Sequence, residues 1–280
     1  MTTSGDPSEL LRTLERIATA LEQEPGRTPA CCPPPSGRAL AWEGLGGFRS
    51  VRRFAAVAPD LLVGVDRQKQ LFYDNARRFA AGAPAHDVLL WGERGTGKST
   101  LVRSLLAAVE DPHLTLLAVA ESYLSDLPYI LDQLEPDPRR WVLFCDDLSF
   151  HDTDNRFKEL KVLLEGGLEA RPSNTLLVAT SNRRHLVPES FTAQGEIHPE
   201  EAVAEEISLA DRFGLSLGFY PFNQGQYLEA VDRHLTELGC PAPAGEWQTE
   251  ALRWAMARGI RSGRSAQQAA REIAARRELP

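Results

Sequence analysis

The sequence predicts an α/β fold, a parallel sheet sandwiched by helices, followed by a small all-helical domain. Two apolar runs, Val88–Trp91 and Trp141–Cys145, have the length and composition of buried parallel strands. A glycine-rich loop follows the first run, and then apolar residues recur at helical spacing, namely Leu101, Val102, Leu105, Leu106 and Val109. From Pro221 onward the pattern changes to three helical segments, which are Tyr227–Leu238, Trp247–Ala257 and Ser265–Arg277.

The 280 residues are enough for one large α/β domain with a small satellite. A net charge of −8 argues against a surface uniformly suited to nucleic acid. The four cysteines have neither metal-ligand spacing nor a disulfide framework; they are Cys31, Cys32, Cys145 and Cys240. The start has no basic and apolar leader, and no apolar stretch is long enough to cross a bilayer. We therefore expect a cytoplasmic protein without a membrane partner.

The amino-terminal segment combines a helix with a linker. Asp6-Pro7-Ser8-Glu9 has the pattern of a capped helix start, and apolar residues then fall on one face, namely Leu10, Leu11, Leu14, Ile17, Ala18 and Leu21. Residues 25–38 are rich in proline and glycine, which predicts an extended linker. We expect three parts: residues 1–40 as helix and linker, 41–220 as the α/β domain, and 221–280 as the helical domain.

Further elements of the α/β domain follow from the same patterns. They are a helix containing Leu71 to Phe79, a strand at Leu114–Ala120, a helix at Tyr123–Leu134, a strand at Leu176–Asn182 and an acidic surface loop at 189–206.

The loop Gly92–Ser99 reads Gly-Glu-Arg-Gly-Thr-Gly-Lys-Ser and has the spacing of a phosphate-binding loop. Its glycines allow successive N–H groups to turn toward phosphate oxygens at the positive end of the following helix. Lys98 is then expected to be a solvent-reachable contact to the β- and γ-phosphates of a nucleotide, and Ser99 to ligate Mg²⁺. The alternative is a turn that only joins a strand to a helix.

Polar residues end two other predicted strands. In a phosphate-loop enzyme Asp146 would hold the Mg²⁺ shell and Asp147 would face the attacking water. Alternatively, both aspartates are merely solvated. Asn182 either helps to position that water or caps a turn.

The order of these segments resembles the AAA+ ATPases over residues 50–280. Three further segments carry the resemblance. They are Val63-Gly64, expected in an adenine pocket, the arginine-containing motif Asp211-Arg212-Phe213-Gly214, and Gly263-Arg264, expected in a helical lid. Three segments are similar to the bacterial AAA+ family of predicted ATPases that carries a domain-of-unknown-function label. They read Phe-Cys-Asp-Asp-Leu-Ser-Phe, Ala-Thr-Ser-Asn-Arg-Arg-His-Leu and Leu-Ala-Asp-Arg-Phe-Gly-Leu.

This resemblance implies a homo-oligomer in which Arg212 enters a neighbour's site as an arginine finger, although an internal salt bridge is the alternative. It implies that Arg264 contacts the γ-phosphate, with Arg261 as a rival. One departure is Asp147, where most AAA+ motors carry glutamate. The implied nucleotide-binding residues are Val63, Gly64, Gly92, Glu93, Arg94, Gly95, Thr96, Gly97, Lys98, Ser99 and Thr100.

Three functions follow as hypotheses. The first is an ATPase that converts ATP to ADP and phosphate to remodel or load a macromolecular partner. Its Mg²⁺ ligands would be Ser99 and Asp146, and its catalytic residues would be Lys98, Asp147, Asn182, Arg212 and Arg264. The second is an ATP-dependent switch or loader that hydrolyses little. The third is a small-molecule kinase, which leaves the arginine box and lid unexplained. The sequence does not identify the partner as protein or nucleic acid.

Overall fold

A computed structural model describes residues 33–148, 160, 164, 170–182, 212–241, 245 and 247–278. Four features expected from the sequence lie outside these ranges: the amino-terminal helix, the pair Cys31 and Cys32, the loop 189–206, and Asp211. Within the described ranges, no helix has the length and apolar character needed to span a membrane.

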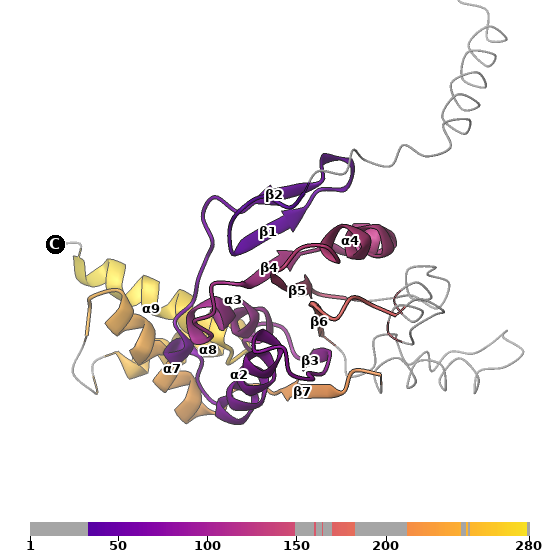
Figure 1. Cartoon of the computed structure of the whole chain (residues 1–280). Coiled ribbons are helices and arrows are strands. Elements are labelled where there is room, and N and C mark those ends of the chain that lie inside the picture. The colour runs from indigo at the N-terminus through magenta and orange to yellow at the C-terminus, as the bar shows by residue number, and fades with distance from the viewer. Residues whose placement is uncertain are drawn as a thin grey trace, which may run out of the picture.

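A seven-stranded sheet forms the centre of the α/β domain (Figure 1). Its spatial order is β2-β1-β4-β5-β6-β3-β7, and every neighbouring pair is parallel except β1 and β2. The strands are β1 (Ala39–Trp42), β2 (Phe48–Ser50), β3 (Val88–Gly92), β4 (Leu114–Ala118), β5 (Arg140–Cys145), β6 (Thr175–Ser181) and β7 (Leu215–Phe219). The predicted α/β fold with a mostly parallel sheet is confirmed, with three strands, β1, β2 and β7, that the sequence patterns did not reveal.

Helices cover both faces of this sheet because its central strands are apolar on both sides. Val88 and Leu90 pack with α2 (Asp66–Ala80) and α3 (Lys98–Ala108), whereas Leu89 packs with α4 (Leu127–Leu134). This alternation follows from the two-residue period of a strand. Since β5, β6 and β3 are adjacent and parallel, their carboxyl ends lie together at one edge of the sheet.

The continuous helix predicted over Tyr123–Leu134 is wrong. The segment consists of a short 3₁₀ helix, η3 (Glu121–Asp126), followed by α4, and Tyr123 has non-helical angles of φ −113° and ψ 17°. The break precedes Pro128, which lies in the first turn of α4. Proline lacks the N–H needed inside a helix but fits its first turn, so it starts a new helix here.

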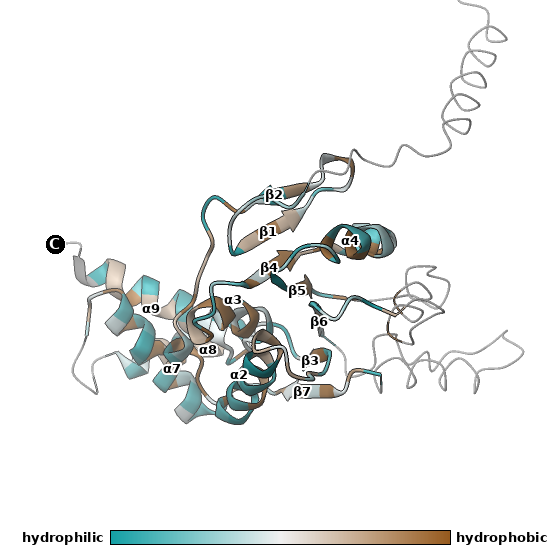
Figure 2. Ribbon diagram, viewed as in Figure 1, coloured by the Kyte–Doolittle hydropathy of each residue, from teal (hydrophilic) through white to brown (hydrophobic). Residues whose placement is uncertain are grey.

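The predicted helical tail is confirmed as α7 (Gln224–Glu237), α8 (Gln248–Arg258) and α9 (Gly263–Glu278). Asn223 and Gln226 form a capping box at the start of α7. The three helices enclose a core of their own around Tyr227, Trp247 and Ile273. Figure 2 shows hydrophilic and hydrophobic segments alternating along these helices, as expected of amphipathic helices around a small core.

Candidate functional site

The loop Gly92–Ser99 connects β3 to α3 at the carboxyl edge of the sheet. Gly92, Gly95 and Gly97 have φ angles of 132°, 79° and 107°, which residues with a Cβ rarely adopt. A Cβ on Gly92 would lie 2.0 Å from the carbonyl oxygen of Phe219 in β7. The backbone path of this loop therefore requires glycine at these positions.

Lys98 begins α3, and its side chain turns back over the loop. The prediction that it is solvent-reachable is wrong, because only 7% of the residue is exposed. Its Nζ donates hydrogen bonds to the carbonyl oxygens of Gly92 (2.6 Å) and Glu93 (2.8 Å) and to Oδ1 of Asn182 (3.2 Å). Burial lowers the pKa of Lys98, although the carboxylates of Asp147 and Asp146 act in the opposite direction. The loop itself thus shields this ammonium group.

Asp146 follows β5 and accepts hydrogen bonds from two hydroxyl groups on neighbouring elements. Ser99 Oγ and Thr180 Oγ1 each donate to Oδ1 of Asp146 at 2.6 Å. Hard oxygen donors of this kind suit Mg²⁺, which is bound by one or two carboxylates together with substrate phosphates. Within the described ranges no group of three or more His, Cys, Asp and Glu residues is placed to hold a metal. The donor set at Ser99 and Asp146 fits Mg²⁺ because that ion needs no such cage.

Asp147 has a φ of 56°, the only positive value outside glycine among the described residues. Its N–H donates to Thr180 Oγ1 at 2.8 Å, and its Oδ1 accepts a hydrogen bond from Asn182 Nδ2. Arg94 Nη2 lies 3.7 Å from the other carboxylate oxygen. The Asp147 side chain is 57% exposed, so its neighbours fix its direction without covering it.

These groups line one cavity of about 690 Å³, a volume typical of small-molecule sites. The loop residues Arg94–Thr100 form one wall beside Asp146, Asp147 and Asn182, and Arg264 of the lid faces them. The Arg264 N–H donates to the Gly95 carbonyl oxygen at 3.4 Å. The remaining lining residues are Ala55, Ala56, Val57, Leu61, Leu62, Val63, Arg103, Thr180, Phe222, Ala230, His234, Glu237, Gly263, Gln267 and Arg271.

Five residues predicted for the site do not line this cavity. Glu93 and Arg261 line a separate cavity, and Gly92 and Gly64 line neither of the two. Gly64 instead approaches α7 so closely that a Cβ would lie 2.5 Å from a side-chain nitrogen of that helix. Arg212 precedes β7, whose first residue pairs with the first residue of β3. It therefore lies toward the amino edge of the sheet, away from the loop of its own chain.

Sequence reasoning missed several cavity residues. Thr180 joins the Asp146 and Asp147 segments, and its sequence signal was its place two residues before Asn182, on the same side of a strand. Gln267 and Arg271 follow Arg264 at spacings of three and seven residues, which place all three on one face of α9.

The model of the family described as "Protein of unknown function (DUF815)" matches residues 36–277, which is most of the chain. The chain belongs to this family. No curated protein sequence matches this DUF815 chain.

Solved structures share its fold at low sequence identity. The Aeropyrum pernix ORC1 protein, in complex with DNA, is 16% identical over 79% of this chain and 62% of its own, with a TM-score of 0.54. The Thermotoga maritima RuvB Holliday junction branch migration motor is also 16% identical, over 76% of this chain and 70% of its own, with a TM-score of 0.45. The likeness to the ORC1 structure confirms that the DUF815 chain has the AAA+ phosphate-loop fold that the sequence resemblance implied, with a mostly parallel sheet, helices on both faces and a helical region at the end.

Proposed function

We propose that this protein binds ATP with Mg²⁺ and hydrolyses it to ADP and phosphate. The observation that carries the proposal is the convergence, in one cavity, of the glycine-rich loop with Asp146, Asp147, Asn182 and Arg264. Phosphoryl transfer needs little covalent chemistry from a protein, so it depends on positioning and on electrostatic stabilisation. The cavity offers both.

The charge of the cavity supports an anionic ligand. Five cationic side chains line it against three carboxylates, which leaves an excess of two positive charges in a chain whose net charge is −8. The cations are Arg94, Lys98, Arg103, Arg264 and Arg271, and the carboxylates are Asp146, Asp147 and Glu237. A nucleoside triphosphate with bound Mg²⁺ is still an anion and complements this excess.

In this proposal Lys98 and Arg264 neutralise the phosphates from opposite walls, while Ser99 and Asp146 hold Mg²⁺. The ion would neutralise charge on the β- and γ-phosphates. Asp147 orients the attacking water and accepts its proton, and Asn182 fixes the direction of that carboxylate through its hydrogen bond. Arg94–Gly97, Thr100 and Val63 complete the nucleotide site, whereas Glu93 and Arg261 line the separate cavity.

Arg212 is proposed to act in a neighbouring subunit. It lies away from the loop of its own chain, which is where a finger for another subunit's site belongs. The macromolecule that is remodelled or loaded is open between protein and nucleic acid, and the location is proposed to be cytoplasmic. The proposed parts remain 1–40, 41–220 and 221–280, although β1 starts at Ala39, inside the first of them.

The second candidate is a switch or loader that binds ATP, assembles and hydrolyses little. The observation in its favour is that Asn182 donates to one oxygen of Asp147 and Arg94 lies 3.7 Å from the other, so part of the capacity of this carboxylate to accept hydrogen bonds from water is already used.

Turnover and nucleotide binding of the purified full chain test the proposal. Lys98→Ala should abolish or severely weaken ATP binding, because the ammonium group is lost. Asp147→Asn should keep binding but slow hydrolysis by about 10²–10⁴-fold, the usual contribution of a general base. Asp132→Asn, an exposed change on α4, is the matched control. Tight ATP binding with negligible turnover in the parent would favour the switch, and binding unaffected by Lys98→Ala would refute the site.

A further inference from the structure

Arg94 lies within the glycine-rich loop, at a position that the spacing of a phosphate loop leaves open to any residue. The backbone just before it is fixed, because the Glu93 carbonyl oxygen accepts hydrogen bonds from Thr96 Oγ1 (2.7 Å) and Lys98 Nζ (2.8 Å). Glu93 lines the separate cavity, whereas Arg94 lines the nucleotide cavity. The loop therefore presents a second cation to the phosphate site, in addition to Lys98.

The guanidinium group of Arg94 faces Asp147. Its Nη2 atom lies 3.7 Å from Oδ2 of that carboxylate, and this is the one ion pair that Arg94 forms among the described residues. The Arg94 side chain is 75% exposed, so most of its five N–H donors face solvent. An exposed pair of this kind is weak. Arg94 can therefore exchange Asp147 for a stronger anionic partner.

A chain of polar contacts joins Asp147 to the ammonium group of the loop. Its Oδ1 accepts a hydrogen bond from Asn182 Nδ2, and Asn182 Oδ1 accepts one from Lys98 Nζ at 3.2 Å. Burial has the largest effect in lowering the pKa of Lys98, and of the two arginines that lower it further, Arg94 acts more strongly than Arg264. The positive charge of Arg94 therefore acts at the phosphate end of the cavity.

The γ-phosphate of ATP would be a stronger partner for Arg94 than Asp147 is. In the proposed reaction the attacking water lies about 3 Å from the Asp147 carboxylate and about 3–3.5 Å from the γ-phosphorus. The phosphorus is then about 6 Å from the carboxylate, a distance that rotation of an exposed arginine side chain covers. A phosphoryl group also offers several oxygens to the planar fork of guanidinium donors.

We propose that Arg94 is a catalytic arginine supplied by the same chain, which pairs with Asp147 in the empty site and moves to the γ-phosphate when ATP binds. This inference rests on the proposed function and adds to it a residue that distinguishes ATP from ADP. The move places positive charge where negative charge develops in phosphoryl transfer. It also leaves Oδ2 of Asp147 open to the attacking water.

Arg94 takes part in the reaction without moving a proton. The water oxygen bonds to the γ-phosphorus as the bond from that phosphorus to the β–γ bridging oxygen breaks. ADP leaves with the bridging oxygen and the electron pair of the broken bond, and Asp147 accepts the proton of the water. The guanidinium group stays protonated and contacts only the oxygens of the transferred group.

Calorimetric titration of the full chain with Mg²⁺ and either ADP or a non-hydrolysable ATP analogue tests the contact. Arg94→Met keeps the length of the side chain and removes its charge. We expect affinity for the ATP analogue to fall about 10–100-fold, as for one lost charge-assisted hydrogen bond, while ADP affinity stays close to that of the parent. Arg94→Lys should restore part of the loss, because it keeps the charge without the fork. Arg77→Met is the matched control, since Arg77 is another exposed arginine, paired with Asp74 at 2.9 Å on α2.

Turnover and a double-mutant cycle provide the second readout. At saturating ATP, Arg94→Met should hydrolyse about 10²–10³-fold more slowly, the usual cost of losing one donor to developing charge. Asp147→Asn should raise affinity for the ATP analogue by up to about fivefold more in the parent than in the Arg94→Met background, because only the parent gives up an ion pair on binding. An equal change in both backgrounds would show that Arg94 does not exchange Asp147 for the phosphate.

The outcomes separate this inference from the proposed function. If Arg94→Met loses ADP and ATP-analogue affinity equally, or loses neither, Arg94 does not contact the γ-phosphate, although the nucleotide site stands. If Arg94→Met hydrolyses ATP at the rate of the parent, the catalytic role is wrong. If the parent binds neither nucleotide, the proposed function fails and this inference fails with it.

Discussion

Thr180 offers the sharpest test of how the site is built. Valine has nearly the same shape, so Thr180→Val removes the hydroxyl from a residue that is 1% exposed without opening a cavity. The lost bond to the Asp146 carboxylate is worth about 1.5–3 kcal/mol, and the lost bond from the Asp147 N–H about 1 kcal/mol. That second bond also supports a backbone conformation that costs about 1–3 kcal/mol. We expect the free energy of unfolding to fall by about 2–4 kcal/mol.

The same hydroxyl orients the proposed Mg²⁺ ligands, so its loss should change how nucleotide binding depends on Mg²⁺. Removing a group that orients a metal ligand typically costs about 10–100-fold in metal affinity or activity. A fluorescent ATP analogue titrated with Mg²⁺ measures this, and its binding in EDTA reports the loop alone. We expect the Mg²⁺ midpoint of Thr180→Val to rise by about 10–100-fold while binding in EDTA stays close to that of the parent.

Two variants separate this role from simple loss of stability. Thr180→Ser keeps the hydroxyl and should restore the Mg²⁺ midpoint. Thr175→Val, at the far end of β6, removes a buried hydroxyl that donates to the Pro172 carbonyl oxygen at 2.7 Å. It should lower stability without moving the midpoint. If Thr180→Val behaves as Thr175→Val does in the Mg²⁺ titration, Thr180 is a structural residue and the reasoning fails.

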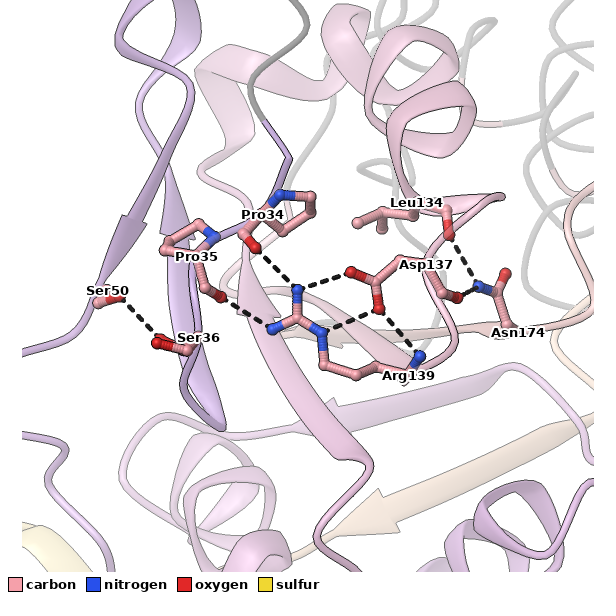
Figure 3. Close-up of polar contacts among 8 residues, drawn as sticks. All are labelled: Pro34, Pro35, Ser36, Ser50, Leu134, Asp137, Arg139 and Asn174. Carbon is pink, nitrogen blue, oxygen red and sulfur yellow. Dashed lines mark hydrogen bonds and ion pairs between the residues drawn. The ribbon is translucent and has the colours of Figure 1, made fainter.

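Three further predictions follow from other parts of the chain. Arg212→Ala should bind ATP yet hydrolyse it about 10³–10⁵-fold more slowly. Mixing this variant with the Asp147→Asn variant should recover part of the activity, because some assembled sites then combine an intact Asp147 with an intact Arg212 from the neighbour. If the two variants assemble together without recovering activity, Arg212 does not act in a neighbouring subunit. Burial raises the pKa of Cys145 to about 12, so about 10⁻⁴ of it is thiolate at pH 8, and maleimide should label it only after unfolding. Burial raises the pKa of Asp137, but the hydrogen bonds and charge of Arg139 (Figure 3) together lower it by more, so the pKa in the folded state is below its usual value. The pair therefore stabilises the fold above about pH 4 and loses that effect as pH falls through the lowered pKa. Asp137→Asn should make the free energy of unfolding depend less steeply on pH in that range.

The central strands were predictable because each is buried on both faces and therefore apolar throughout. β3, β4, β5 and β6 have this character. The missed strands lie toward the edges of the sheet, where burial leaves a weaker pattern. β2 has three residues, none fully buried, and β7 alternates between exposed and buried positions around Ser216. Their pairing with neighbours, rather than their own sequence, defines them.

Within the site, the spacing of residues in one loop was readable, but contacts between segments were not. The sequence predicts that Gly92–Ser99 can cradle phosphate, yet nothing local predicts that the Lys98 ammonium folds onto the carbonyl oxygens of that loop. The resemblance implied Arg264 as the γ-phosphate contact and left Arg261 as a rival. The turn before α9 separates them, because Arg264 lines the cavity beside the glycine-rich loop and Arg261 lines the separate cavity that contains Glu93.

The backbone at Asp147 gives a physical reason for its departure from glutamate. Its φ of 56° lies in the left-handed region, which aspartate and asparagine tolerate better than longer side chains because their short polar groups bond locally. Here the short carboxylate accepts a hydrogen bond from Asn182 of the adjacent strand end, while the N–H of Asp147 donates to Thr180. Glutamate at this position would meet the same strain without that tolerance. The aspartate is therefore explained by the turn that follows β5, and its presence alone does not argue for slow turnover. The observation that favours a switch is the partial use of its carboxylate by Asn182 and Arg94.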